Sequence, residues 1–311
     1  MHGMFDHLIH ADWSIGASKR WFASATRGES GWLVQAPAQV SDSSQFLDLT
    51  FSYGSSQRVL AGFDFPIGVP EAYGIKTGFR NFREMLPALW RDGWSDFSEV
   101  AKLPAEISLT RPFYPMSSTK GVSRAELVTG LGVSSFDELL RICERRTQHR
   151  QAACSLFWTL GGNQVGKAAL TGWQEIVRPA LLRDAKLWPF DGALADLMDA
   201  PGLVLAETYP AEAYRMVGAG FKPGAESKRN REHRRSKAVP ILDWAGKYAV
   251  LFTPDAQAAL VDGFGDSKSG EDPFDALLGL LGMIEVVEGR QCERTEEHAV
   301  ITTWEGWILG R

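Results

Sequence analysis

The stretch SSQFLDLTFSYGSSQRVLAGFDFPIGVP, residues 43–70, decides the fold because its pattern changes from helix to strand. Phe46, Leu49 and Tyr53 recur at helical spacing. The apolar run RVLAGF follows, stops at Asp64 and leads into a Pro/Gly turn, which is typical of a buried strand. A helix placed before such a strand predicts a parallel crossover in a sheet, right-handed by default.

Upstream of this stretch the pattern predicts three strands. FDHLIHADW (5–13), KRWFASAT (19–26) and WLVQAP (32–37) have strand character. The turn signals SIGAS and RGESG separate them. Because both turns are short, we expect the three strands to pair antiparallel in sequence order.

Downstream, GLVLAE (202–207) predicts a fifth strand that runs into a helix, and 272–289 predicts an apolar, buried helix. Residues from about 71 to 201, between the fourth and fifth strands, have helical patterns and are expected to form a large helical insertion. The order β-β-β-α-β-α-β-α predicts a single α/β domain over residues 1–311. Its mixed five-stranded sheet would be covered on both faces as a three-layer α/β/α structure.

Within this insertion, FDELLRICERRTQHR (136–150) predicts an amphipathic helix. Phe136, Leu139 and Cys143 would share its apolar face. Arg141 and its neighbouring arginines would lie on the polar side, where a solvated face is the simplest interpretation.

Carboxylates stand where apolar runs stop or begin. Asp12, Asp64 and Glu207 end the first, fourth and fifth strands, and Asp275 opens the run DALLGLLGM. The carboxyl ends of parallel strands meet at one edge of a sheet, where α/β proteins usually bind ligands. We therefore expect the four side chains to converge. A single aspartate after a strand is also a common turn former or helix cap, and Asp272 fits that second role best, although it is a further possible ligand.

Converging carboxylates repel one another unless a cation lies between them. Mg²⁺ or Mn²⁺ takes oxygen ligands of this kind. Two such ions about 4 Å apart activate a water and stabilise the leaving oxygen in phosphodiester cleavage. The pattern thus predicts catalytic metal ligands at Asp12, Asp64, Glu207 and Asp275.

A basic segment lies between the last two of these acids. Lys228, Arg231, Arg234 and Arg235 crowd into the stretch SKRNREHRRSK. On a helix the three arginines would share a face that could follow the phosphates of a nucleic-acid backbone. A solvated helix face balanced by nearby acids is the alternative interpretation.

Composition limits the possible classes. The chain has 311 residues, a net charge of -5, and ordinary globular proportions of 44% hydrophobic and 23% charged residues. The net charge argues against a general nucleic-acid coat protein but not against a local basic groove. None of the three cysteines belongs to a Cys-x-x-Cys pair, and their odd number gives no disulfide framework. With no signal peptide and no long apolar run, we expect a soluble cytoplasmic protein without membrane contact.

Several blocks resemble the domain-of-unknown-function 429 family. They are GFDFPIGVP, AETYPAEAY, SKRNREHRRSKAVPIL, DPFDALLGLL and the late EGWILG, and they cover most of the chain outside the insertion. Members of that family are described as predicted nucleases with a ribonuclease-H-like fold. The resemblance implies a three-layer sheet protein with a two-metal acidic site at Asp12, Asp64, Glu207 and Asp275. The first block departs from the family pattern, since Trp13 and Ser14 stand where a glycine-rich turn is more common.

Three function classes remain open. The leading hypothesis is a metal-dependent phosphodiester hydrolase that acts on nucleic acid. The second is an actin-like phosphotransferase or ATPase, with the turn from Ser14 to Lys19 holding a nucleotide phosphate. The third is a non-catalytic binding module with a degenerate site and the insertion as its partner surface.

Overall fold

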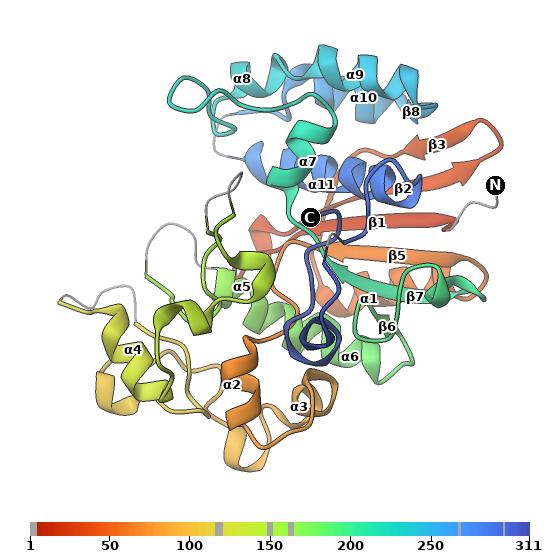
Figure 1. Ribbon diagram of the computed structural model, residues 1–311. Coiled ribbons are helices and arrows are strands. Elements are labelled where there is room, and N and C mark those ends of the chain that lie inside the picture. Colours follow the sequence, from red (N-terminus) through yellow and green to blue (C-terminus); the bar gives the residue numbers. More distant parts are fainter. Residues whose placement is uncertain (1–4, 116–120, 148–151, 161–164, 267–268, 295) are drawn as a thin grey trace.

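The computed structural model describes residues 5–311 apart from 116–120, 148–151, 161–164, 267–268 and 295. These residues form an α/β structure around one mixed, eight-stranded sheet, in the order β6-β7-β5-β1-β2-β3-β8 with β4 paired to β2 (Figure 1). The strands are β1 His7–Asp12, β2 Trp21–Gly28, β3 Gly31–Val34, β4 Ala38–Gln39, β5 Arg58–Phe63, β6 Lys186–Leu187, β7 Gly202–Glu207 and β8 Val250–Phe252.

Strand pairing follows the predicted pattern in the centre of the sheet. β1 pairs antiparallel with β2, and β2 with β3. On its other side β1 pairs parallel with β5, and β5 parallel with β7. The prediction of five strands was too low because β4, β6 and β8 are only two or three residues long. Runs that short show no alternation in a sequence.

Helices cover both faces of the sheet, and alternate residues of each strand face opposite layers. Ile9 and Ala61 pack in one core with residues of α1 (Ser43–Gly54). Leu8 and Leu60 pack in a second core with residues of α11 (Glu271–Val287). This two-sided burial explains why the central strands are apolar at nearly every position.

The helix α11 approaches β1 closely. His10 is fully buried beneath it, and its Nδ1 lies 3.0 Å from the carbonyl oxygen of Ala276. A Cβ added to Gly279 would lie only 2.1 Å from the His10 ring. Glycine is therefore the one residue that allows this helix to lie so near the strand.

The segment between β5 and β7 is mainly helical and partly separate from the sheet. α2, α3 and α4 lie in a lobe beside the carboxyl ends of the strands (Figure 1). A continuous helical run, made of α5, a π-helical turn and α6, packs on α1 instead. The short strand β6 joins the sheet. The bounds are α2 Glu71–Lys76, α3 Phe82–Ala88, α4 Arg124–Leu131, α5 Val165–Gly172, a π-helical turn Trp173–Val177 and α6 Arg178–Leu181.

The predicted amphipathic helix at 136–150 is wrong over its described part. Two short 3-10 turns, Phe136–Leu139 and Ile142–Glu144, replace it, and residues 148–150 lie outside the described residues. Arg141 has extended backbone between the turns and is fully buried rather than on a solvated face. The ion pairs of this arginine, described below, override the local helical pattern.

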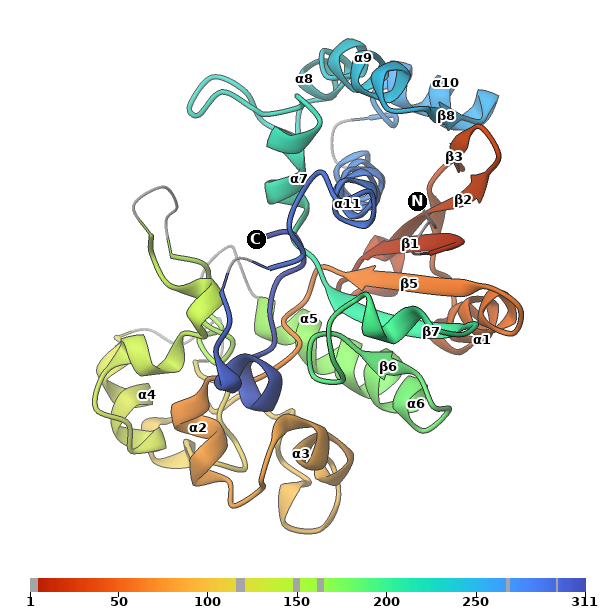
Figure 2. The same cartoon turned by 45° about the vertical axis from the view of Figure 1, so that its right-hand side comes forward.

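The remaining helices follow β7. α7 (Pro210–Met216) packs on α11, while α8 (Arg231–Arg235), α9 (Ala238–Lys247) and α10 (Pro254–Asp262) lie beyond it (Figure 2). The C-terminal segment returns to the sheet, where the Leu309 amide donates a 2.9 Å hydrogen bond to the Glu207 carbonyl. No helix in the described part of the chain is both long and apolar enough to cross a membrane.

Candidate active site at the carboxyl edge of the sheet

Asp12 and Asp64 stand side by side at the carboxyl ends of the paired parallel strands β1 and β5. Both have the strand phase of Leu8 and Leu60, so they face α11. The two carboxyl groups share a hydrogen bond, and Asp64 Oδ1 also accepts a 2.6 Å hydrogen bond from the Trp13 amide. A hydrogen bond between two carboxyl groups requires a proton on one of them.

Asp275, in the first turns of α11, faces the same place. Its carboxylate accepts hydrogen bonds from the Tyr214 hydroxyl and the Lys228 ammonium, one on each oxygen. It is buried and close enough to Asp12 and Asp64 to repel both electrostatically. Three of the four predicted acids therefore come together.

The pKa values of this cluster are displaced towards neutrality. Burial raises the pKa of Asp64 to about 6. Burial also raises the pKa of Asp12 well above its usual range, and the charges of Asp64 and Asp275 raise it further. The pKa of the neighbouring Asp272 rises to about 6, first by burial and then by the charge of Glu271. Such a cluster retains a proton near neutral pH unless a cation replaces it.

One cation is already present at the edge of the cluster. Lys228 Nζ contacts Asp275 and lies 3.1 Å from Glu271 Oε1. Burial opposes the charged form, but the Asp275 and Glu271 carboxylates outweigh it and raise the pKa of Lys228. The lysine therefore stays charged, and its charge also lowers the pKa of Asp64.

Glu207 does not join this cluster, contrary to the prediction. It is paired with Phe63 in the β5–β7 register and has the strand phase of Leu205, so it faces away from α11. Both of its oxygens bind the Arg141 guanidinium at 2.6 Å, and one also accepts a 2.7 Å hydrogen bond from the Ile67 amide. Both carboxylate oxygens of Glu207 are therefore engaged in internal hydrogen bonds in this structure.

Thr208, the next residue, has the strand phase that faces α11 and is not among the predicted site residues. Its Oγ1 is buried and makes no hydrogen bond among the described residues. It lines a cavity of about 190 Å³ with Asp64, Tyr209 and Lys228, and the Arg141–Glu207 pair lines the same cavity. Thr208 shares the strand phase of Val204 and Ala206, but this strand is apolar on both faces, so its sequence carries no signal that favours Thr208 over Glu207.

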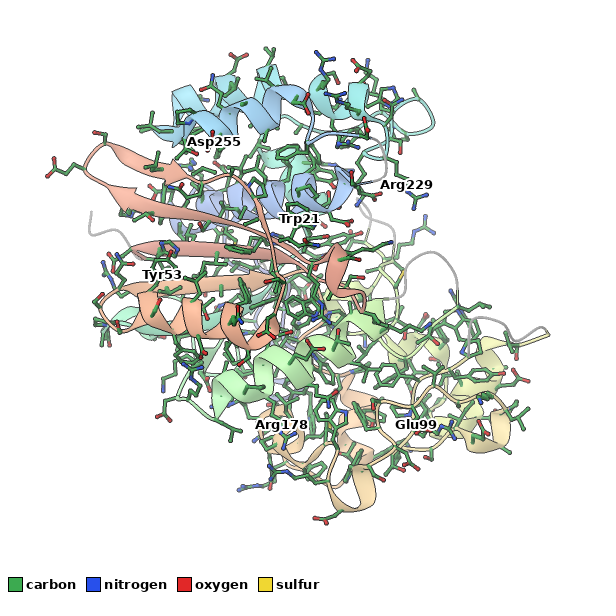
Figure 3. The ribbon with its side chains drawn as sticks, turned by 180° about the vertical axis from the view of Figure 1, so that it is seen from behind. Trp21, Tyr53, Glu99, Arg178, Arg229 and Asp255 are labelled. Atoms are coloured by element: carbon green, nitrogen blue, oxygen red, sulfur yellow. The ribbon has the colours of Figure 1, made fainter. Side chains whose placement is uncertain are left out.

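The basic segment does not form the predicted phosphate-binding face. Arg234 is fully buried and donates to the carbonyl oxygens of Gly263 at 2.8 Å and Lys228 at 2.6 Å, so its role is to fix the loops around it. Arg231 pairs with Asp262, and Arg235 with Glu232 at 3.1 Å, both away from the carboxylates. Figure 3 shows the exposed Arg229 at the periphery of the molecule. Lys228 alone of the four predicted cations lies at the acidic cluster.

Metal binding here would depend on the carboxylate oxygens of Asp12 and Asp64. Within the described ranges, no three His, Cys, Asp or Glu side chains are arranged to hold a metal ion together. The Asp12–Asp64 pair could still supply one or two carboxylates. Mg²⁺ commonly takes that number and completes its shell with water and substrate phosphate.

No family model matches the chain, and no curated protein or solved structure is significantly similar to it.

Proposed function

We propose that this protein is a Mg²⁺- or Mn²⁺-dependent hydrolase of phosphodiesters in nucleic acid, built on a ribonuclease-H-like sheet. The observation that carries the proposal is the convergence of Asp12, Asp64 and Asp275 at the carboxyl edge of β1 and β5. The resemblance to the domain-of-unknown-function 429 family supports the same activity. The antiparallel β1-β2-β3 run followed by parallel β5 and β7 supports the fold assignment.

In this proposal Asp12 and Asp64 hold the cation in place of their shared proton. When bound, the cation would supply an activated water and stabilise charge on the reacting phosphate. Lys228 is charged, borders the cavity that Asp64 lines, and would hold a phosphate oxygen. Tyr214 fixes one Asp275 oxygen and would limit how far that carboxylate can rotate towards the cation.

The test measures Mn²⁺ binding and cleavage in the same variants. Wild-type protein should gain thermal stability with Mn²⁺ and cleave a fluorescent oligonucleotide only when the ion is present. Asp12→Asn should lose both effects while keeping the fold. Asp255→Asn is the matched control, because it removes an exposed aspartate from the first turn of α10. Mn²⁺-dependent cleavage that persists in Asp12→Asn would reject the assignment.

A binding module without catalysis is the second candidate. Two internal ion pairs favour it. Arg141 pairs with Glu207 and Lys228 pairs with Asp275, so two of the four predicted metal ligands already have a cationic partner within the protein. Mn²⁺ that neither stabilises the wild type nor supports cleavage would select this candidate. The actin-like alternative has less support, because the described residues form one sheet and contain no second β-meander domain.

A further inference from the structure

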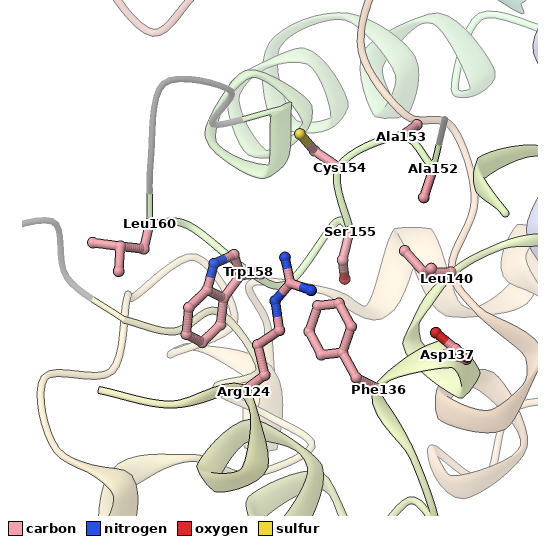
Figure 4. A pocket seen from close by; sticks show the side chains of 10 residues that line it. All are labelled: Arg124, Phe136, Asp137, Leu140, Ala152, Ala153, Cys154, Ser155, Trp158 and Leu160. Atoms are coloured by element: carbon pink, nitrogen blue, oxygen red, sulfur yellow. The ribbon is translucent and has the colours of Figure 1, made fainter. Parts of the chain in front are cut away.

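A second cavity lies in the lobe formed by the insertion. Its volume is about 340 Å³, which is within the range of roughly 300–1,000 Å³ that small-molecule sites occupy. Figure 4 shows a guanidinium, two aromatic rings and a carboxylate around it. Its lining includes Arg124, Phe136, Trp158, Ala153 and Cys154.

Arg124 presents a cation whose hydrogen-bonding edges are open. Its guanidinium stacks over the Phe136 ring at 4.3 Å and lies 5.9 Å from the centre of the Trp158 ring. Across the described part of the chain it makes no hydrogen bond or ion pair. Stacking occupies a face of the group but leaves its in-plane N–H donors directed outwards, where a phosphate can accept them.

Trp158 supplies a fixed aromatic surface beside this cation. Its ring meets the Phe136 ring edge-on at 6.3 Å and the Tyr114 ring at 6.1 Å. The flanking backbone is pinned to Tyr114 by hydrogen bonds of 2.9 Å on either side of Trp158. The indole is half-buried, so part of it stays open to a stacking partner.

The Arg124 cavity adjoins the cavity at the acidic cluster. Ala153 and Cys154 line both of them, and the cavity at the acidic cluster continues to Asp64, Thr208 and Lys228. A chain molecule that places a phosphate near Lys228 could therefore extend past Ala153 to reach Arg124.

We infer that the Arg124–Phe136–Trp158 cavity binds one nucleotide of a single-stranded nucleic acid whose neighbouring phosphate lies at the acidic cluster. Arg124 holds a backbone phosphate, and Trp158 stacks on the base. The inference rests on the proposed function for its choice of ligand. It assigns to the insertion a part in substrate binding that requires neither a metal ion nor cleavage.

The test is a binding measurement in EDTA, so that no metal chemistry contributes. Fluorescence anisotropy would follow short, 5′-fluorescein-labelled oligothymidylate and oligouridylate. Arg124→Gln should weaken binding about tenfold or more, because it removes a charge-assisted hydrogen bond to phosphate. Arg124→Lys should lose less, since it keeps the charge. Trp158→Leu should weaken binding about fivefold or more by removing base stacking.

Arg183→Gln is the matched control, because Arg183 is an exposed arginine that pairs with Asp48 instead of lining the cavity. It should bind like the wild type, and circular dichroism should show that Arg124→Gln is folded. The inference is overturned if the wild type binds neither oligonucleotide, if Arg124→Gln keeps wild-type affinity, or if Arg183→Gln weakens binding equally. Binding through Arg124 without any Mn²⁺-dependent cleavage would sustain the inference and reject only the proposed catalysis.

Discussion

Arg141 donates two hydrogen bonds of 2.6 Å to the two carboxylate oxygens of Glu207, and both side chains are buried. The same guanidinium bonds to Glu144 at 2.9 Å and to the Glu305 carbonyl at 3.0 Å. The pair thereby ties the insertion to the end of β7 and to the C-terminal segment. This is a structural connection at a position where the sequence pattern predicted a metal ligand.

Replacing Glu207 should therefore damage the fold rather than the metal site. Glu207→Gln removes one of the two buried carboxylates that Arg141 pairs with and leaves only Glu144, so we expect a loss of about 3 kcal/mol, the lower end for a broken buried pair. Urea denaturation would measure the loss in the free energy of unfolding. The triple variant Arg141→Met/Glu144→Gln/Glu207→Leu should lose less, because it removes all three buried charges together. A Glu207→Gln protein that kept wild-type stability would show that the pair is not a structural connection.

Asp64→Asn should stabilise the protein at neutral pH. The folded pKa of Asp64 is raised to about 6 from 3.8, so its favourable contribution is complete below 3.8 and is lost as the pH rises through 6. At pH 7 the ionised group opposes folding, and its removal should gain on the order of 1–3 kcal/mol.

Thermal unfolding at pH 7 and pH 4 would check this sign, because the gain should nearly disappear at pH 4. The asparagine oxygen can still accept the Trp13 amide hydrogen bond, so that contact is kept. Asp255→Asn should show no comparable dependence on pH. A loss of stability at pH 7 in Asp64→Asn would contradict the view that burial makes the ionised Asp64 carboxylate unfavourable in the fold.

The buried histidines should make the protein sensitive to acid. Burial lowers the pKa of His10 to about 3 and that of His7 to about 4. A lowered folded pKa means that the unfolded state takes up the proton first, so stability is lost as the pH falls below 6.5. The raised pKa of Asp64 makes stability change with pH in the opposite direction. The effect of His10 must therefore be measured as the difference in unfolding free energy between the wild type and a His10 variant.

The destabilisation caused by His10→Gln should be about 2–3 kcal/mol smaller at pH 4.5 than at pH 7. Urea denaturation at both values would measure the difference. His298→Gln, at an exposed histidine, should behave like the wild type at both. An equal destabilisation by His10→Gln at the two pH values would show that His10 is not neutral in the fold.

Two glycine-to-alanine substitutions should have opposite effects. Gly279→Ala places a methyl group 2.1 Å from the His10 ring and should cost at least about 1–3 kcal/mol through overpacking of α11 on β1. Gly246→Ala in α9 meets nothing within 4 Å and should gain roughly 0.5–1 kcal/mol from helix propensity. Thermal unfolding would compare them. Similar losses in both would mean that the contact with His10 is not the cause.

The local patterns predicted the parts of the fold that depend on neighbours in sequence. The alternating and continuous apolar runs located β1, β2, β3, β5, β7 and α11, and the turn lengths predicted the antiparallel start. Those patterns also placed Asp12 and Asp64 at one edge, since both follow parallel strands. They did not extend to β4, β6 and β8, which are held by pairing rather than by their own periodicity.

By itself, then, the sequence determined a mixed α/β sheet with aspartates at its carboxyl edge. Burial and strand direction follow from local apolar patterns and turn lengths, which involve residues close together in the chain. Only the tertiary structure decided which charges meet. Arg141 reaches Glu207 across 66 residues, Arg234 turns inwards to loop carbonyls, and Lys228 joins Asp275 from another loop. The partner of a buried charge depends on which opposite charge lies near it in three dimensions and on the cost of desolvating both groups. Neither quantity can be read from the spacing of residues along the chain.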